Sequence, residues 1–396
     1  MADSTSHPDT STASLREAAL AIAAQLPTRA AQTDRERLIP DETIAALRAA
    51  GLLRLLQPAR WGGHEAHPQQ MIDLANILAE QCLSTAWVFG VLSVQSFMLA
   101  LFDERAQRDV WGEDAGALLS SSFMPMGKVL RAEGGFRVSG QWPYSSGSAH
   151  AQWALIGGIV PPASAEGKPE MRVFLVPRSD YEIVDTWQTF GLRGTGSNDL
   201  RLADVFVPDY RSWMPGQGLL PGSRQSIHEA ALFRMPWLFI FGSSVAGLGI
   251  GGARGAIEAF TETARAKLAA PGGASKLDPA SLQAAAKARS EVDELDASLR
   301  RSVARLMDCA ASGETMAPAE AWQHRVVLTS VVRRCTALVD GLMPHIGAKS
   351  VFSAHRFTRF WLDLCAARAH PGNDPAAAAA ELGKLLLENG ASAAPP

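Results

Sequence analysis

The sequence predicts a chain in three parts, with helices at both ends and a small β unit between them. From about Ser14 to Trp111, and again from about Ile227 onward, apolar residues recur every three or four positions, which is the period of an amphipathic helix. Between these regions the period changes to two, as in a half-buried strand. We therefore expect a helical domain over residues 1–115, a β domain over 116–215 and a second helical domain over 216–396.

The first helical region divides at a turn-rich break, QPARWGG, over residues 57–63. Before the break, Ile44, Leu47 and Leu52 lie on one helical stripe. After it, two longer helical stretches are expected, over Pro68–Gln81 and Ser84–Phe102.

In the β region the segment FRVSGQWPYSSG alternates clearly, with Phe136, Val138, Trp142 and Tyr144 on one face. Three further apolar runs separated by Gly and Pro turns are expected to be strands. These runs are WALIGGIV, MRVFLVP and LRLADVFVP.

The helical period then returns and holds to the end of the chain. The expected helices are Ala253–Ala269, Pro279–Ala311, Pro318–Leu342, Val351–His370 and Ala376–Leu387. The stretch from Met235 to Ala253 carries no charge and approaches the length of a membrane span. Because it contains one proline and several glycines, a buried helix is the expectation, and a membrane helix is the alternative.

The composition of the chain argues against nucleic-acid binding, a cysteine metal site and membrane association. The chain has 396 residues, a net charge of −3 and a pI near 6.3, without a basic stripe, so nucleic acid is not an expected partner. The four cysteines stand singly, which predicts buried thiols in a reducing cytoplasm and no metal site. The polar N-terminus has no apolar core of a secretory signal, and no membrane association is expected.

Six motifs occur in an order and spacing that resemble the acyl-CoA dehydrogenase superfamily. They are STAWVFGVLSVQSF (84–97), SSSFMPMGKV (120–129), GQWPYSSGSAHAQWALIGG (140–158), GLRGTGSNDL (191–200), FRMPW (233–237) and HRFTRFWLDLCAARAHPGND (355–374). Within the superfamily the chain is similar to the oxygenase components of para-hydroxyphenylacetate hydroxylase, secosteroid phenol hydroxylase and polyketide-pigment hydroxylases. The resemblance implies an N-terminal helical domain, a central small β-barrel or sandwich and a C-terminal four-helix bundle.

The resemblance also implies the activity. The chain would be the oxygenase component of a two-component flavin-dependent monooxygenase. It would take reduced flavin, FMNH2 or FADH2, from a separate NAD(P)H:flavin reductase. With O2 it would hydroxylate a phenolic or polyketide-like aromatic molecule through a flavin C4a-hydroperoxide, as a homotetramer. GLGIGG (247–252) imitates a dinucleotide fingerprint, but no strand precedes it, so the chain is not expected to bind NAD(P)H.

Ser146 is the first candidate catalytic residue. Strand parity places it with Phe136, Val138, Trp142 and Tyr144, on their apolar face, provided that the strand has no bulge. The resemblance implies a hydrogen bond from this position to the flavin N5 edge, in a site that excludes water. The alternative is a serine that merely ends a strand in a turn.

His370 is the second candidate catalytic residue. Pro371 places it at the C-terminal end of a helix, where the helix dipole would raise its pKa, and Arg359 and Asp363 are spaced as an i,i+4 ion pair. The resemblance implies that this histidine removes the phenol proton. The alternative is a histidine that caps helix carbonyls, and His345 is a weaker competitor for the role.

The resemblance assigns the remaining site residues. Substrate contacts would come from Ser122, His370 and Gln95, the last at a position where some phenol hydroxylases have histidine. Flavin contacts would come from Ser121, Phe123, Trp142, Ser145, Ser146, Arg193, Thr195, Ser197 and Arg265. Arg265 would meet a cofactor phosphate across a subunit boundary, or be an exposed helix arginine.

Three other functions stay open at this stage. An acyl-CoA dehydrogenase of the same fold is disfavoured because no carboxylate occurs between Leu364 and Asn373, where such enzymes tend to carry a catalytic Glu. An N- or S-oxygenating enzyme would not need the phenol deprotonated. A non-enzymatic assembly protein would leave the hydroxyl-rich motifs without a purpose.

Overall fold

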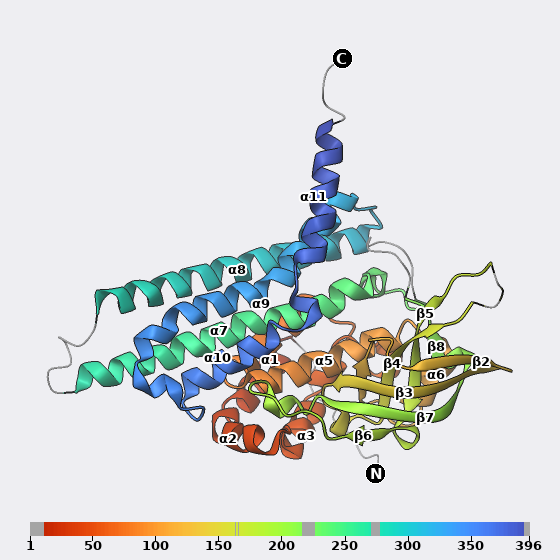
Figure 1. Cartoon of the computed structure of the whole chain (residues 1–396), viewed down its shortest axis with the longest axis horizontal. Coiled ribbons are helices and arrows are strands. Elements are labelled where there is room, and N and C mark those ends of the chain that lie inside the picture. Colours follow the sequence, from red (N-terminus) through yellow and green to blue (C-terminus); the bar gives the residue numbers. More distant parts are fainter. Residues whose placement is uncertain (1–11, 163, 165, 216–225, 271–277, 392–396) are drawn as a thin grey trace, which may run out of the picture.

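The computed structural model describes residues 12–162, 164, 166–215, 226–270 and 278–391. Its N-terminal part is helical: α1 (Thr12–Ala23), α2 (Leu26–Glu36), α3 (Asp41–Ala49), α4 (Pro68–Ala79), α5 (Leu83–Leu99) and α6 (Glu104–Trp111). Every residue of α5 is buried, because the other helices and the β region surround it (Figure 1). Helix α5 therefore forms the centre of the fold, where the N-terminal helices, α7 and the β region all pack against it.

The middle of the chain forms two four-stranded sheets. One has the order β1 (Leu119–Ser122), β4 (Trp153–Val160), β5 (Glu170–Pro177) and β8 (Ser212–Trp213). The other has the order β2 (Lys128–Ala132), β3 (Gly135–Ser145), β7 (Asn198–Pro208) and β6 (Glu182–Val184). Side chains from both sheets share one apolar core, so the predicted barrel or sandwich is a sandwich.

β3 shows where the parity argument fails. Phe136, Val138 and Trp142 are buried as predicted, but Tyr144 is 61% exposed with a φ of 68°. The pairing of β3 with β7 shifts register between Trp142 and Ser145, and such a bulge reverses the face on which later side chains lie. The predicted shared face of Tyr144 is therefore wrong, and Ser146 is buried because the chain turns inward after β3.

The C-terminal part is helical again: α7 (Trp237–Ala269), α8 (Pro279–Ser312), α9 (Pro318–Ile346), α10 (Arg356–Ala367) and α11 (Ala376–Ala391). Helices α7 to α10 run side by side, and α11 projects from this bundle (Figure 1). The boundaries predicted at 115/116 and 215/216 stay predictions, the second beside residues outside the described ranges.

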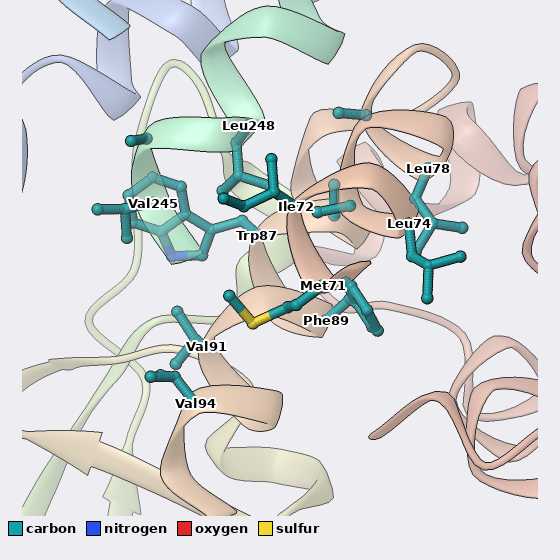
Figure 2. Close-up of a cluster of buried hydrophobic side chains, with 14 of the residues drawn as sticks. Met71, Ile72, Leu74, Leu78, Trp87, Phe89, Val91, Val94, Val245 and Leu248 are labelled. Carbon is teal, nitrogen blue, oxygen red and sulfur yellow. The ribbon is translucent and has the colours of Figure 1, made fainter. Parts of the chain in front are cut away.

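Most of the uncharged stretch 235–253 forms the first half of α7, which is fully buried from Gly242 to Ala253. Its glycines let α7 approach its neighbours closely. A Cβ on Gly251 would lie 2.6 Å from the carbonyl oxygen of Asn76, and a Cβ on Gly90 would lie 2.9 Å from that of Ser244. Figure 2 shows Val245 and Leu248 of α7 packed beside Trp87. Among the described residues, no helix combines the length and apolar character needed to cross a bilayer.

Candidate active site

Ser146 lies immediately after β3, where Gly147 turns the chain with a φ of 69°. The Ser146 hydroxyl is buried between α5 and the loop before β7. Trp87 Nε1 of α5 donates a hydrogen bond to Ser146 Oγ at 3.1 Å, and Ser197 Oγ lies 2.7 Å from it. The hydroxyl predicted to meet the flavin is thus held by two partners that are distant in the sequence.

The loop before β7 continues this polar arrangement. Ser197 Oγ lies 2.7 Å from Thr195 Oγ1, and Thr195 Oγ1 donates to the carbonyl oxygen of Leu192 at 2.8 Å. Leu192 and Gly196 adopt left-handed backbone conformations on either side of the short 3-10 turn Arg193–Thr195. This geometry turns both hydroxyls inward, toward Ser146.

His370 approaches the same place from the C-terminal part of the chain. The rings of His370 and Trp87 are 5.4 Å apart and meet edge to face at 72°. Trp87 therefore contacts both candidate catalytic residues and brings Ser146 and His370 to one place, while their catalytic roles stay predictions. Sequence reasoning quoted Trp87 within a motif but assigned it no role.

The protonation state of His370 follows from its hydrogen bond. His370 Nδ1 accepts from the backbone N–H of Gly372 at 3.0 Å. In the neutral ring the hydrogen must therefore be on Nε2, because Nδ1 is acting as the acceptor. Burial lowers the pKa of His370 to about 4, so the ring is neutral at pH 7.

The predicted rise of the His370 pKa is thus wrong. Helix α10 ends at Ala367, so His370 lies beyond the last turn and begins the short 3-10 helix Pro371–Asn373, while burial penalises the charged ring. The predicted Arg359–Asp363 ion pair is also absent from the described structure. Instead, Asp363 Oδ1 accepts from the Leu192 N–H at 2.6 Å, and burial raises the Asp363 pKa to about 7.

The low pKa of His370 predicts a loss of stability in acid. Between pH 6.5 and pH 4 the unfolded chain binds the histidine proton more readily than the folded protein, so the free energy of unfolding falls as the pH falls. For this half-buried ring the loss is about 2 kcal/mol. Urea unfolding of the wild type and His370→Gln at pH 7 and pH 4.5 measures it. The wild type should lose more stability than the variant, and equal losses would contradict the assignment.

A cluster of aromatic rings continues from His370 through Phe241. Phe241 lies 5.8 Å from the histidine ring, and Phe123 lies 5.8 Å from both Phe241 and Trp237. These rings come from the N-terminal end of α7 and the end of β1, and each is only half-buried. Sequence reasoning missed Trp237 and Phe241, although FRMPW was among the motifs; a period of four from Trp237 to Phe241 was the available signal.

Several buried polar side chains near these elements have no hydrogen-bond partner in the described structure, and Gln95 and Ser145 are two of them. Both amide atoms of Gln95 are unpartnered although the residue is fully buried, and the same holds for Ser145 Oγ. Gln95 is eight positions after Trp87 on α5, and i+4 spacing places Trp87, Val91 and Gln95 along one face. Figure 2 shows Trp87 and Val91 on a common side of this helix. A buried amide without a protein partner keeps its hydrogen-bonding capacity for a ligand or an ordered water.

Comparison with known proteins identifies the family. A model described as the acyl-CoA dehydrogenase N-terminal domain matches residues 9–115, and one described as its C-terminal domain matches residues 243–375. The oxygenase subunit HsaA of a flavin-dependent monooxygenase from Rhodococcus jostii (strain RHA1) is 37% identical over 361 residues, covering 89% of this chain and 93% of the relative. The chain belongs to the flavin-dependent monooxygenases.

Solved structures agree with this family and fold. The 3-HSA hydroxylase from Rhodococcus sp. RHA1 superposes with a TM-score of 0.89 at 34% identity, covering 98% of each chain. XiaF from Streptomyces sp., solved in complex with FADH2 and glycerol, has a TM-score of 0.86 at 26% identity, covering 95% of this chain and 96% of XiaF. The predicted acyl-CoA dehydrogenase-like fold and the predicted monooxygenase activity are confirmed.

The serine hydroxyls of this site are suited to hydrogen bonds with the edge of a flavin ring. Ser146 Oγ has hydrogen-bonding capacity beyond its contacts with Trp87 and Ser197, and Ser145 Oγ is buried without a partner in the described structure. Ser121 shares the face of Leu119, which packs in the helical core, so it lies on the side of β1 that faces the helices. Ser121 and Phe123 come from β1 and its end, and Ser145 and Ser146 come from the end of β3, which packs against β1.

Other predicted site residues lie elsewhere or are already engaged. Trp142 points into the sandwich core and donates to the Gly157 carbonyl at 2.7 Å, so its predicted flavin contact is wrong. Ser122 donates to the Pro143 carbonyl at 2.7 Å, which uses its hydrogen within the fold. Arg193 pairs with Asp34 and lines a cavity of about 460 Å³ together with Ser84 and Asp363.

Arg265 lies far from these residues. It is exposed and pairs with Glu258 at 3.2 Å. At 1.5 Å per residue it is roughly 36 Å along α7 from Phe241. Within one chain it therefore cannot meet a flavin ring held at Ser146.

Proposed function

We propose that this protein is the oxygenase component of a two-component monooxygenase that hydroxylates an uncharged phenolic small molecule, using reduced flavin and O2. The observation that carries the proposal is the position of Trp87, which joins Ser146 on the flavin side to His370 on the substrate side. The 37% identical HsaA relative and FADH2-bound XiaF support it.

On the flavin side, Ser146 would meet the N5 edge, with Ser121, Ser145 and Phe123 beside the ring. When bound, reduced flavin supplies the electrons that activate O2. Ser146, Ser197 and Thr195 are only 6%, 3% and 1% exposed. The protein would therefore keep water away from the flavin edge that these hydroxyls face. FMN and FAD are both candidates for this site.

On the substrate side, Trp237, Phe241 and Phe123 would hold an aromatic ring. His370 Nε2–H would donate to the phenolic oxygen and stabilise the negative charge that grows there as the phenol proton leaves to water. That charge activates the ring carbon beside the oxygen. A neutral histidine with a low pKa is a weak base, so donation replaces the proton removal expected from the sequence.

Gln95 would bind a second polar group of the substrate through its unpartnered amide. None of the side chains proposed for the substrate side carries a charge at pH 7. They are Trp87, Gln95, Phe123, Trp237, Phe241 and His370. This composition favours an uncharged substrate, because a buried carboxylate without a cation would be costly.

The protein would receive its flavin from a separate NAD(P)H:flavin reductase and would act as a homotetramer in the cytoplasm. In a tetramer, Arg265 would contact a cofactor phosphate held by a neighbouring subunit. The described cysteines are all buried free thiols, which suits a reducing compartment.

The experiment supplies chemically reduced FMN or FADH2, 18O2 and a panel of uncharged and carboxylated phenols to the purified protein. We expect one 18O atom in a ring-hydroxylated product, with uncharged phenols preferred. Ser146→Ala should raise the fraction of reduced flavin lost as hydrogen peroxide several-fold. No labelled product with either flavin, or an N- or S-oxide as the main product, would contradict the proposal.

A further inference from the structure

The hydroxyl groups beside Ser146 form a chain whose hydrogens can be assigned by counting. Ser146 Oγ, Ser197 Oγ, Thr195 Oγ1 and the Leu192 carbonyl oxygen follow in series, with separations of 2.7, 2.7 and 2.8 Å. Each short separation requires a hydrogen between the two oxygens. The carbonyl has none, so the three hydroxyls supply one hydrogen to each gap. Ser146 therefore donates to Ser197, Ser197 to Thr195, and Thr195 to Leu192.

Both ends of the chain are held by indole groups, which can only donate. Trp87 Nε1–H donates to Ser146 Oγ at 3.1 Å, and Trp187 Nε1–H donates to the Leu192 carbonyl at 2.9 Å. Ser146 has thus committed its hydrogen to Ser197 and one lone pair to Trp87. Toward any further ligand it presents one lone pair and acts only as an acceptor.

We propose that this chain makes the site selective for flavin with a hydrogen on N5, that is, for reduced over oxidised flavin. The inference rests on the proposed function, in which Ser146 faces N5. The reduced ring has an N5–H that Ser146 can accept, whereas N5 of the oxidised ring is itself an acceptor. Two acceptors would then face each other in a buried place, and the lost hydrogen bond weakens binding. The protein would hold the flavin that a reductase delivers and release the oxidised form.

Two pairs of variants test the direction of the chain. Ser197→Ala removes the acceptor of the Ser146 hydrogen, which frees that hydrogen for oxidised N5. Thr195→Val frees it indirectly, because Ser197 can then donate to Ser146 instead. Thr195→Ser keeps the terminal hydroxyl, and Ser148→Ala removes a buried hydroxyl that has no partner in the described structure, so both are controls.

The measurement is the dissociation constant of oxidised and of anaerobically reduced FMN and FAD, by equilibrium dialysis, with thermal unfolding to verify folding. We expect the preference of the wild type for reduced flavin to fall about 3- to 10-fold in Ser197→Ala and Thr195→Val, through tighter binding of oxidised flavin. The two controls should keep the wild-type ratio. Ser146→Ala should weaken reduced flavin without strengthening oxidised flavin.

The outcomes separate this inference from the proposed function. If the wild type binds neither reduced flavin, the proposed function fails. If it binds reduced flavin but Ser197→Ala and Thr195→Val retain the wild-type ratio, the selectivity does not come from the hydroxyl chain and the inference is overturned.

Discussion

Replacing His370 by alanine is expected to lower the hydroxylation rate about 10²- to 10³-fold. The loss comes from the Nε2–H that would stabilise the ionised phenol, since Nδ1 is already occupied by the Gly372 N–H. Single-turnover product formation with reduced flavin, O2 and an uncharged phenol measures this effect. Reduced-flavin affinity should stay within a few-fold of the wild type, because His370 lies on the substrate side of Trp87.

His370→Gln supplies the matched control for this prediction. Its amide retains an N–H donor of similar reach but cannot act as a histidine base, so it should recover part of the rate that His370→Ala loses. An unchanged rate in His370→Ala would remove His370 from the chemistry and favour oxidation of nitrogen or sulfur. A rate in His370→Gln as low as that in His370→Ala would argue for a base in place of a donor.

Replacing Trp87 by alanine is expected to cost about 3–5 kcal/mol of unfolding free energy. The indole is 4% exposed and lies where α4, α5 and α7 meet, beside Val245 and Leu248 (Figure 2). The substitution also removes the N–H that Ser146 accepts and the ring that packs against His370. Urea unfolding measures the stability, and product formed per reduced flavin consumed measures the functional loss.

Trp87→Phe distinguishes packing from hydrogen bonding. It keeps most of the apolar volume but loses the indole N–H, so it should recover most of the stability while product per reduced flavin stays below the wild-type value. Full recovery of both quantities would show that the Trp87–Ser146 hydrogen bond has no functional part. A stability loss in Trp87→Ala below about 1 kcal/mol would contradict the central position of this ring.

Much of the architecture followed from local patterns. The change of period from helix to strand and back matches the order of the elements, because burial of one face imposes the same periodicity on every helix or strand. The uncharged segment 235–253 was expected to be a buried helix, and its glycines allow the close approach of α4 and α5 that buries it. The motifs also indicated Ser146 and His370 before any geometry was known.

The errors came from effects that a linear pattern does not contain. Tyr144 was expected on the buried face of β3, but a bulge in β3 exposes it. The bulge depends on how β3 pairs with β7, which the sequence of β3 alone does not contain. The His370 pKa moved opposite to the dipole argument, because desolvation by the packed neighbours outweighs a helix end that stops at Ala367. Trp142 was assigned to the flavin although its N–H is needed inside the sandwich.

By itself, the sequence determined the order of helices and strands and the family, and it singled out Ser146 and His370 as candidates, because periodicity and motifs are local properties of the chain. Only the tertiary structure decided that Trp87 joins Ser146 to His370, that His370 is neutral, and that three hydroxyls donate in one direction toward Leu192. Each of these depends on burial and on distances of a few ångströms between segments far apart in the chain.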